Sequence, residues 1–234
     1  MDKSSKTGSR NRLRWRLGLG LAAAALALAV IPADSALAAK KAVKATPSFF
    51  SSKEVRSSKM KPFKKWRAAI RRYSKESKAA KKKGDCTETV LNKCHYDTWM
   101  KFLAAIKDKD PLTQINEVNR YMNRARYITD QNNWGKKDYW ASPAEFFARF
   151  GDCEDYAIAK FLSLKLLGFR TGQLRVVAVK DMNLKVGHAV LVVFIDGKTY
   201  LLDNQIKKVV VTKTVRHYKP VFSINTKYWW RHRT

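Results

Sequence analysis

A cysteine stands among carboxylates in the stretch GDCEDYA, residues 151–157. Asp152 precedes Cys153, and Glu154 and Asp155 follow it. A cysteine acts as a nucleophile only as its thiolate, and neighbouring negative charge raises the pKa of the thiol. A helix-like run follows, and the free N–H groups and positive dipole end of a helix N-terminus favour the thiolate form of Cys153. The stretch therefore predicts that Cys153 lies at the start of a helix, where its thiolate can form and act as a nucleophile.

A nucleophilic cysteine needs a base and a group that orients the base. His188 opens a β-rich segment, and Asp196-Gly197 is a two-residue hairpin turn that sets the pairing of the strands on either side. Counting outward from this turn, Asp203 becomes the diagonal neighbour of His188 on the same face of the sheet. The spacing is compatible with a Cys153-His188-Asp203 triad. The alternative is a hydrogen-bonded histidine at the end of a sheet.

The other two cysteines, Cys86 and Cys94, are close enough in sequence to form a disulfide in an oxidising compartment. Cys153 would then remain as a free, reactive thiol. The alternative is that all three cysteines are unpaired and buried. No CxxC pair or histidine-rich spacing predicts a zinc site.

The first 38 residues have the pattern of a secretory signal peptide. Arginines crowd the start, residues 17–31 are apolar, and Ala36-Leu37-Ala38 matches a small-x-small cleavage site. We therefore expect cleavage after Ala38 and a periplasmic protein. The alternative is an uncleaved membrane anchor, although the apolar run is short for a bilayer.

Positive charge is concentrated in one part of the chain. The protein has 48 Lys and Arg against 19 Asp and Glu, and residues 39–83 alone hold seventeen Lys and Arg against two Glu. Residues 39–60 predict a linker, whereas Trp66, Ile70 and Tyr73 recur at helical spacing. We interpret 39–83 as a basic linker and amphipathic segment whose apolar stripe packs on the following domain while the rest stays in solvent. The alternative is that the segment contacts an anionic envelope polymer or lipid.

Residues 84–234 predict one domain of the α+β class, with N-terminal helices packed on an antiparallel β-sheet. Helical periodicity comes first along the chain, and period-two alternation follows it. The predicted helices are 95–109, 112–128, a short one after the capping box at Ser142, and 153–167; the predicted strands are 174–180, 188–195 and 198–203.

Several segments resemble the bacterial transglutaminase-like cysteine proteinases, the group that includes the LapG-type periplasmic proteases. They are GDCEDYAIAKFLSLKLLGF, the HAVLVV strand with the following YLLDN, NRYMNRARYITDQNNWGKKDYWASPAEFF and YKPVFSINTKYWW, and together they cover roughly residues 84–230. The resemblance implies a papain-like transglutaminase core. It also implies that Cys153 is the nucleophile, His188 the base and Asp203 the orienting group.

The resemblance implies a cofactor as well. LapG-type members need Ca²⁺ held by carboxylates beside the cysteine, and Asp152, Glu154 and Asp155 match those positions. Oxygen ligands suit this cation, and its charge would offset the carboxylates that oppose the thiolate. The alternative is that these residues only cap the helix. For the oxyanion we expect the N–H of Cys153, with Asn133 or Trp134 as a second donor.

The resulting expectation is an exported cysteine endopeptidase. The resemblance implies a protein substrate, such as a large surface adhesin in biofilms, and an inner-membrane regulatory receptor. One alternative is an amidase or transglutaminase that uses the same triad. Another is a non-catalytic basic protein that binds envelope polyanions. Because the chain reads as exported, no nucleic acid is expected as a partner.

Overall fold

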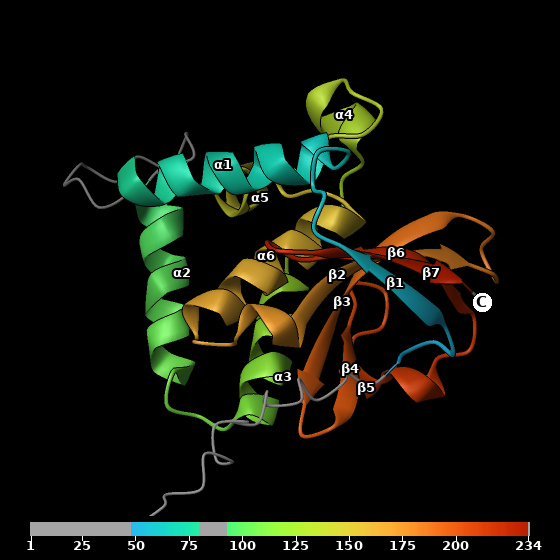
Figure 1. Ribbon diagram of the computed structural model, residues 1–234. Helices are drawn as coiled ribbons and strands as arrows, with labels where there is room; N and C mark the ends of the chain where they lie inside the picture. Colours follow the sequence, from blue (N-terminus) through green and yellow to red (C-terminus); the bar gives the residue numbers. More distant parts are fainter. Residues whose placement is uncertain (1–47, 80–92, 234) are drawn as a thin grey trace, which may run out of the picture. The chain divides into compact units, whose positions relative to one another are not determined.

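The computed structural model describes residues 48–79 and 93–233. All of them belong to one compact unit, Ala45–Thr234. It is an α+β unit, as predicted: a seven-stranded antiparallel sheet in the order β1-β7-β6-β2-β3-β4-β5, with helices gathered on one side (Figure 1). The helices are α1 (Lys64–Ala79), α2 (Lys93–Ile106), α3 (Pro111–Met122), α4 (Asp130–Trp134), α5 (Pro143–Arg149) and α6 (Cys153–Leu166). The strands are β1 (Lys53–Ser57), β2 (Leu174–Asp181), β3 (Gly187–Ile195), β4 (Lys198–Leu202), β5 (Val210–Val211), β6 (Tyr218–Ile224) and β7 (Trp229–Arg233).

Helix α6 is the central helix of the unit. It packs on β2 and β3 and also contacts α3 and α5. Every residue from Asp155 to Leu164 is buried, and burial all around a helix is typical of one enclosed by other elements. Gly168 follows with a φ of 98°, so the helix ends at the predicted glycine. The burial of α6 fixes where its first residue, Cys153, lies.

The β3–β4 hairpin has the predicted register. Ile195 pairs with Lys198, and the pairing continues without a shift to Leu191 and Leu202. Asp196 and Gly197 have φ values of 47° and 74°, as a two-residue turn with two left-handed positions requires. β4 ends at Leu202, so Asp203 is the first residue beyond the strand.

The two faces of the sheet have separate cores. Alternate residues of β3 (Leu191, Val193 and Ile195) face the helices, whereas Val190, Val192 and Phe194 belong to the core of the opposite face. Phe49 and Phe50 cover that second face. His188 has the same parity as Val190, so it belongs to the end of the second face.

Strand β1 extends the sheet at its edge by pairing with β7. Glu54 Oε2 accepts a hydrogen bond from Arg175 Nη1 at 2.6 Å, and the Arg175 guanidinium lies 3.7 Å from the centroid of the Trp230 ring. The sequence analysis placed this stretch in a linker, whereas the structure makes it part of the sheet. A short edge strand with few apolar residues carries no clear period-two signal.

Helix α1 packs its apolar stripe on the same unit. Trp66 and Ala69 are buried in the main core, and the Trp66 ring meets Phe161 of α6 edge-on, with 5.3 Å between ring centroids. This arrangement is the one that the sequence favoured for the basic segment: the apolar stripe packs on the domain, and most of the lysines and arginines are exposed.

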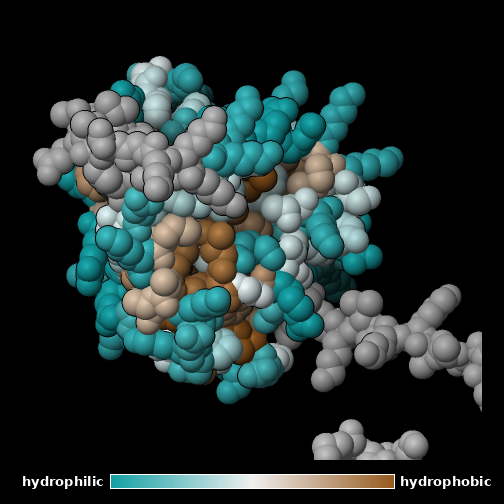
Figure 2. Space-filling view, turned by 90° about the vertical axis from the view of Figure 1, so that its left-hand side faces the viewer, coloured by the Kyte–Doolittle hydropathy of each residue, from teal (hydrophilic) through white to brown (hydrophobic). Residues whose placement is uncertain are grey.

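Other local differences concern short elements. Residues 130–134 form α4 where a loop was predicted, and α3 ends at Met122 although the apolar spacing continues toward residue 128. β5, β6 and β7 were not predicted as strands. The predicted signal peptide lies outside the described residues, and within the described ranges no helix has the length and apolarity needed to cross a membrane. Figure 2 shows that hydrophilic side chains cover most of the face that carries α1 and α2, around a central apolar patch.

Candidate active site

Cys153 is a free thiol at the first residue of α6. Its Sγ lies 3.1 Å from Glu154 Oε2, and the backbone N–H of Ala189, the residue after His188, donates toward it. Burial raises the pKa of the Cys153 thiol, and the negative charge of Glu154 raises it further. Both effects oppose the lowering of this pKa that is expected from the helix N-terminus.

His188 and Asp203 meet as the hairpin register predicted. His188 Nε2 lies 2.9 Å from Asp203 Oδ1, and both side chains are buried. Because Nε2 contacts Asp203, Nδ1 is the ring nitrogen available to exchange a proton with a thiol. Asp203 therefore has the position of a group that orients the imidazole.

Two further groups bind the Asp203 carboxylate, and a third binds the backbone carbonyl of Asp203. The backbone N–H of Gln205 donates to Oδ1 at 2.9 Å, and the Tyr218 hydroxyl donates to Oδ2 at 2.7 Å. Asn123 Nδ2 donates to the Asp203 carbonyl at 2.8 Å, which anchors the backbone to α3. Burial alone would raise the pKa of Asp203, but the hydrogen bonds from His188, Gln205 and Tyr218 hold it below its ordinary value. The carboxylate thus stays ionised.

A cluster of five carboxylates adjoins the cysteine. Ligand atoms of Asp130, Asp138 and Glu154 lie within 4.8 Å of one another, and so do those of Asp130, Asp152 and Asp155. Asp152, Cys153 and Glu154 form a third such set. No single set contains all three predicted ligands, and the sequence analysis missed Asp130 and Asp138. Asp130 lies in DQNNWG and Asp138 in KKDYW, and only folding brings them to the cysteine.

The cluster fits a hard cation. Buried Asp130 Oδ1 and Asp152 Oδ1 have no hydrogen-bond partner among the described residues. Burial raises the pKa of Asp130 to about 6 and that of Asp152 to about 7, and the negative charges of neighbouring carboxylates add to both shifts. Oxygen atoms that lack protein donors and repel one another are the donor set that Ca²⁺ prefers.

Asp155 has a structural task in addition. Its Oδ1 accepts the N–H of Ala141 at 2.6 Å, and its Oδ2 accepts the N–H of Asp152 at 3.3 Å. A Cβ on Gly151 would overlap with Asp155 Oδ2, so this position has no room for a side chain. Asp155 therefore makes the contacts of a helix cap, and its role as a cation ligand stays a prediction.

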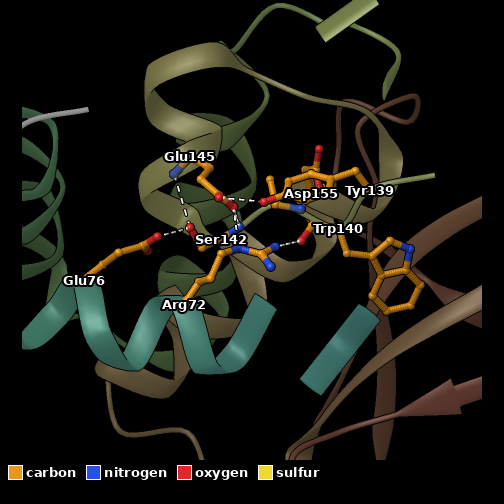
Figure 3. Close-up of polar contacts among 8 residues, drawn as sticks. Arg72, Glu76, Tyr139, Trp140, Ser142, Glu145 and Asp155 are labelled. Atoms are coloured by element: carbon orange, nitrogen blue, oxygen red, sulfur yellow. Dashed lines mark hydrogen bonds and ion pairs between the residues drawn. The ribbon is translucent and has the colours of Figure 1, made fainter. Parts of the chain in front are cut away.

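The segment that binds Asp155 is itself held by α1 (Figure 3). Glu76 Oε1 accepts the Ser142 hydroxyl at 2.7 Å, and Arg72 Nε donates to Glu145 Oε2 at 2.9 Å. Arg72 also donates to the Trp140 carbonyl. The predicted capping box of Ser142 and Glu145 is present at the start of α5. The basic segment therefore supports the start of α6 through these contacts.

The remaining predicted site residues are placed as follows. Asn133 Nδ2 donates to the Phe150 carbonyl at 3.2 Å, and Trp134 Nε1 is buried without a hydrogen-bond partner among the described residues. Neither contact tests the oxyanion role. Cys86 and the Cys94 side chain lie outside the described residues, so the predicted disulfide stays a prediction.

Most of the chain matches one known protein family. The profile of the bacterial transglutaminase-like cysteine proteinases matches residues 85–232, a range that includes Cys153, His188 and Asp203. The chain belongs to this family. It is therefore a transglutaminase-like cysteine peptidase, and the resemblance seen in the sequence is confirmed.

Solved structures support the same assignment for this transglutaminase-like peptidase. Calcium-bound LapG of Legionella pneumophila is 27% identical, with 70% of this chain and 87% of that chain covered and a TM-score of 0.57. EGTA-treated LapG of the same organism is 27% identical, with 71% and 87% covered and a TM-score of 0.57. No curated protein matches the chain.

Proposed function

We propose that this cysteine peptidase is an exported endopeptidase of the periplasm that uses Cys153, His188 and Asp203. The observation that carries the proposal is the 2.9 Å contact between His188 and Asp203, next to Ala189, whose backbone N–H donates toward Cys153 at the start of α6. Export is supported by the signal-peptide pattern of residues 1–38.

Each of the three residues has a separate role in peptide hydrolysis. Cys153 Sγ attacks the peptide carbonyl, and His188 Nδ1 takes the thiol proton and returns it to the leaving amine. Asp203, bound to Nε2, keeps the ring in this orientation and stabilises its charged form. Water then attacks the thioester and releases the acid, again with His188 as the base.

Calcium is the cofactor that we propose for this site. Asp130, Asp138, Asp152 and Glu154 would hold it, since their oxygens gather beside Cys153. Bound there, it would neutralise the carboxylate charge that opposes the thiolate. Among the compared structures, one LapG structure is described as calcium-bound, which supports the proposal.

The substrate that we propose is a protein of the cell envelope. A large surface adhesin, with an inner-membrane receptor as the regulator, is supported by the resemblance to LapG-type proteases. The basic surface of the chain would add long-range attraction to an acidic partner, which weakens with salt.

Alkylation of Cys153 by iodoacetamide, mapped by mass spectrometry, tests the catalytic assignment. We expect rapid labelling with Ca²⁺, slower labelling with a chelator, and slower labelling in His188→Ala. In His188→Ala, peptide hydrolysis should fall at least about a hundredfold, because general acid–base transfer is lost. His217→Ala is the control, since that histidine is partly exposed. A rate of Cys153 labelling that changes neither with Ca²⁺ nor in His188→Ala would contradict the assignment. A product in which the acyl group is joined to an added amine, instead of the hydrolysed peptide, would indicate acyl transfer.

A further inference from the structure

Exposed apolar side chains gather in the chain segments that lead to Cys153 and His188. Met182, Leu184 and Val186 are 38%, 60% and 50% exposed in the turn between β2 and β3. Tyr127 and Phe150 are 52% and 37% exposed. These five are more than half of the nine exposed large hydrophobic residues in the described ranges. Single exposed apolar residues need no explanation, but such a concentration around one site does.

The turn between β2 and β3 is an ordered structure. The buried Asp181 carboxylate accepts the N–H groups of Asn183 at 2.8 Å and Leu184 at 3.0 Å. The Asp181 N–H donates to the Val186 carbonyl at 2.9 Å, and the Met182 N–H donates to the His217 carbonyl at 2.8 Å. The apolar side chains of this turn are therefore held outward by a defined backbone.

Val186 connects this turn to the base. The hydrogen bond from Asp181 extends the β2–β3 ladder to Val186, two residues before His188. Val186 lies at a bend that directly precedes β3, in which His188 is the second residue. Val186 is half exposed and His188 is buried, so the valine marks the solvent side of the base.

Phe150 stands on the nucleophile's side in a strained conformation. Its φ of 62° and ψ of −160° belong to a region that is nearly restricted to glycine. Two hydrogen bonds hold it: the Phe150 N–H donates to the Phe146 carbonyl at 2.7 Å, and Asn133 Nδ2 donates to the Phe150 carbonyl at 3.2 Å. The carbonyl of the next residue, Gly151, accepts the Ile128 N–H at 2.9 Å. The chain thus keeps an aromatic ring partly exposed three residues before Cys153, at a cost in backbone energy.

Tyr127 lies on the same side as Phe150. It forms a parallel bridge with Gly151, two residues before the cysteine. Tyr127 and Phe150 therefore lie next to the segment that carries Cys153, and the turn between β2 and β3 lies next to His188.

From this arrangement we infer that Tyr127 and Phe150 on one side, and Met182, Leu184 and Val186 on the other, form the apolar walls of the groove that receives the substrate. The groove selects a peptide segment with apolar side chains next to the scissile bond and disfavours acidic ones. The inference rests on the proposed function and names its substrate class. Apolar walls with a few polar groups are typical of binding sites, and an acidic side chain placed against such walls loses its hydration without gaining a partner.

Two peptidyl chloromethyl ketones of equal length test this inference, one with Val and Leu before the reactive carbon and one with Asp at both positions. Cys153 Sγ forms a thioether with the methylene carbon, and chloride leaves. Each rate is divided by the rate of iodoacetamide, which needs only the thiolate. In the presence of Ca²⁺ we expect the apolar reagent to react at least about tenfold faster than the acidic one.

Leu184→Ser and Val186→Ser should each lower this preference severalfold and leave iodoacetamide labelling unchanged. Val55→Ser is the matched control, since Val55 is 51% exposed and lies on β1, with three strands between it and β3. Equal relative rates of the two reagents in the wild type would overturn the inference. An equal fall in the relative rates of both reagents in the variants would overturn it as well. Loss of iodoacetamide labelling would instead count against the proposed nucleophile, so the two failures are distinguishable.

Discussion

Lys160 is buried in α6 with an exposed fraction of 1%, and its Nζ has no hydrogen-bond partner among the described residues. Nζ lies 5.7 Å from the centroid of the Tyr156 ring, and Asp203 is the charged group that acts on it. Burial lowers the pKa of Lys160 to about 7, and the negative charge of Asp203 partly opposes this shift. The helix that carries the nucleophile therefore also carries a side chain that costs stability.

Lys160→Met should stabilise the protein at neutral pH by about 1–4 kcal/mol, because a buried charge is replaced by an apolar group. Between pH 7 and 10.5 the unfolded wild-type chain binds more protons at this lysine than the folded chain does. Wild-type stability therefore rises with pH across that window, and the variant lacks this slope. Thermal unfolding at several pH values measures both effects. Lys101→Met, an exposed position on α2, should keep the slope, and a less stable Lys160→Met at pH 7 would refute the argument.

At the scale of elements, the start of α6 is fixed from three directions. Asp155 binds the N–H groups of Ala141 and Asp152, while Ile128 holds the Gly151 carbonyl. Helix α1 in turn braces the segment that contains Ala141 (Figure 3). The position of Cys153 is thus decided by contacts between elements that are far apart in sequence.

Gly151→Ala should therefore damage the site. The new Cβ would overlap with Asp155 Oδ2, so either the helix start or the loop must move, at about 1–3 kcal/mol of stability. We expect a lower unfolding midpoint in denaturant and slower Cys153 labelling. Gly172→Ala is the control, since a Cβ there meets no atom within 4 Å. Equal midpoints for the two variants would show that the close approach is unimportant.

At the scale of the whole molecule, the N-terminal part of the described chain completes the sheet and both cores. Phe49 covers one face of the sheet, Glu54 pairs with the buried Arg175, and Trp66 fills the core on the helical face. Residues 48–79 therefore contribute to the fold that carries the site, although the family profile begins at residue 85.

Two truncations test this contribution. A chain that starts at Ser48 should keep its stability and Cys153 labelling. A chain that starts at Pro62 loses β1 and the ion pair of Glu54 with Arg175, so we expect it to be less stable by at least about 3–5 kcal/mol. Denaturant unfolding of both chains is the measurement. Equal midpoints would show that β1 is dispensable.

The nucleophile segment, the helix it starts and the β3–β4 register were predictable from sequence. Each depends on local chemistry: a helix-forming run after Cys153, and an Asp196-Gly197 turn that permits one pairing of its strands. This register by itself predicts that His188 and Asp203 lie close together. Local signals failed for β1 and α4, which are short and lack a long apolar period.

Only the tertiary structure decided which carboxylates gather and which segments build the unit. Asp130 and Asp138 reach the cysteine because α4 and the segment after it fold back on the start of α6, and no sequence spacing encodes that contact. In the basic residues 39–83 the helical spacing of Trp66, Ile70 and Tyr73 indicated α1, whereas β1 was recognised only in the tertiary structure, where it pairs with β7. Sequence thus determined the residues of the proposed triad, and packing between distant segments determined their surroundings.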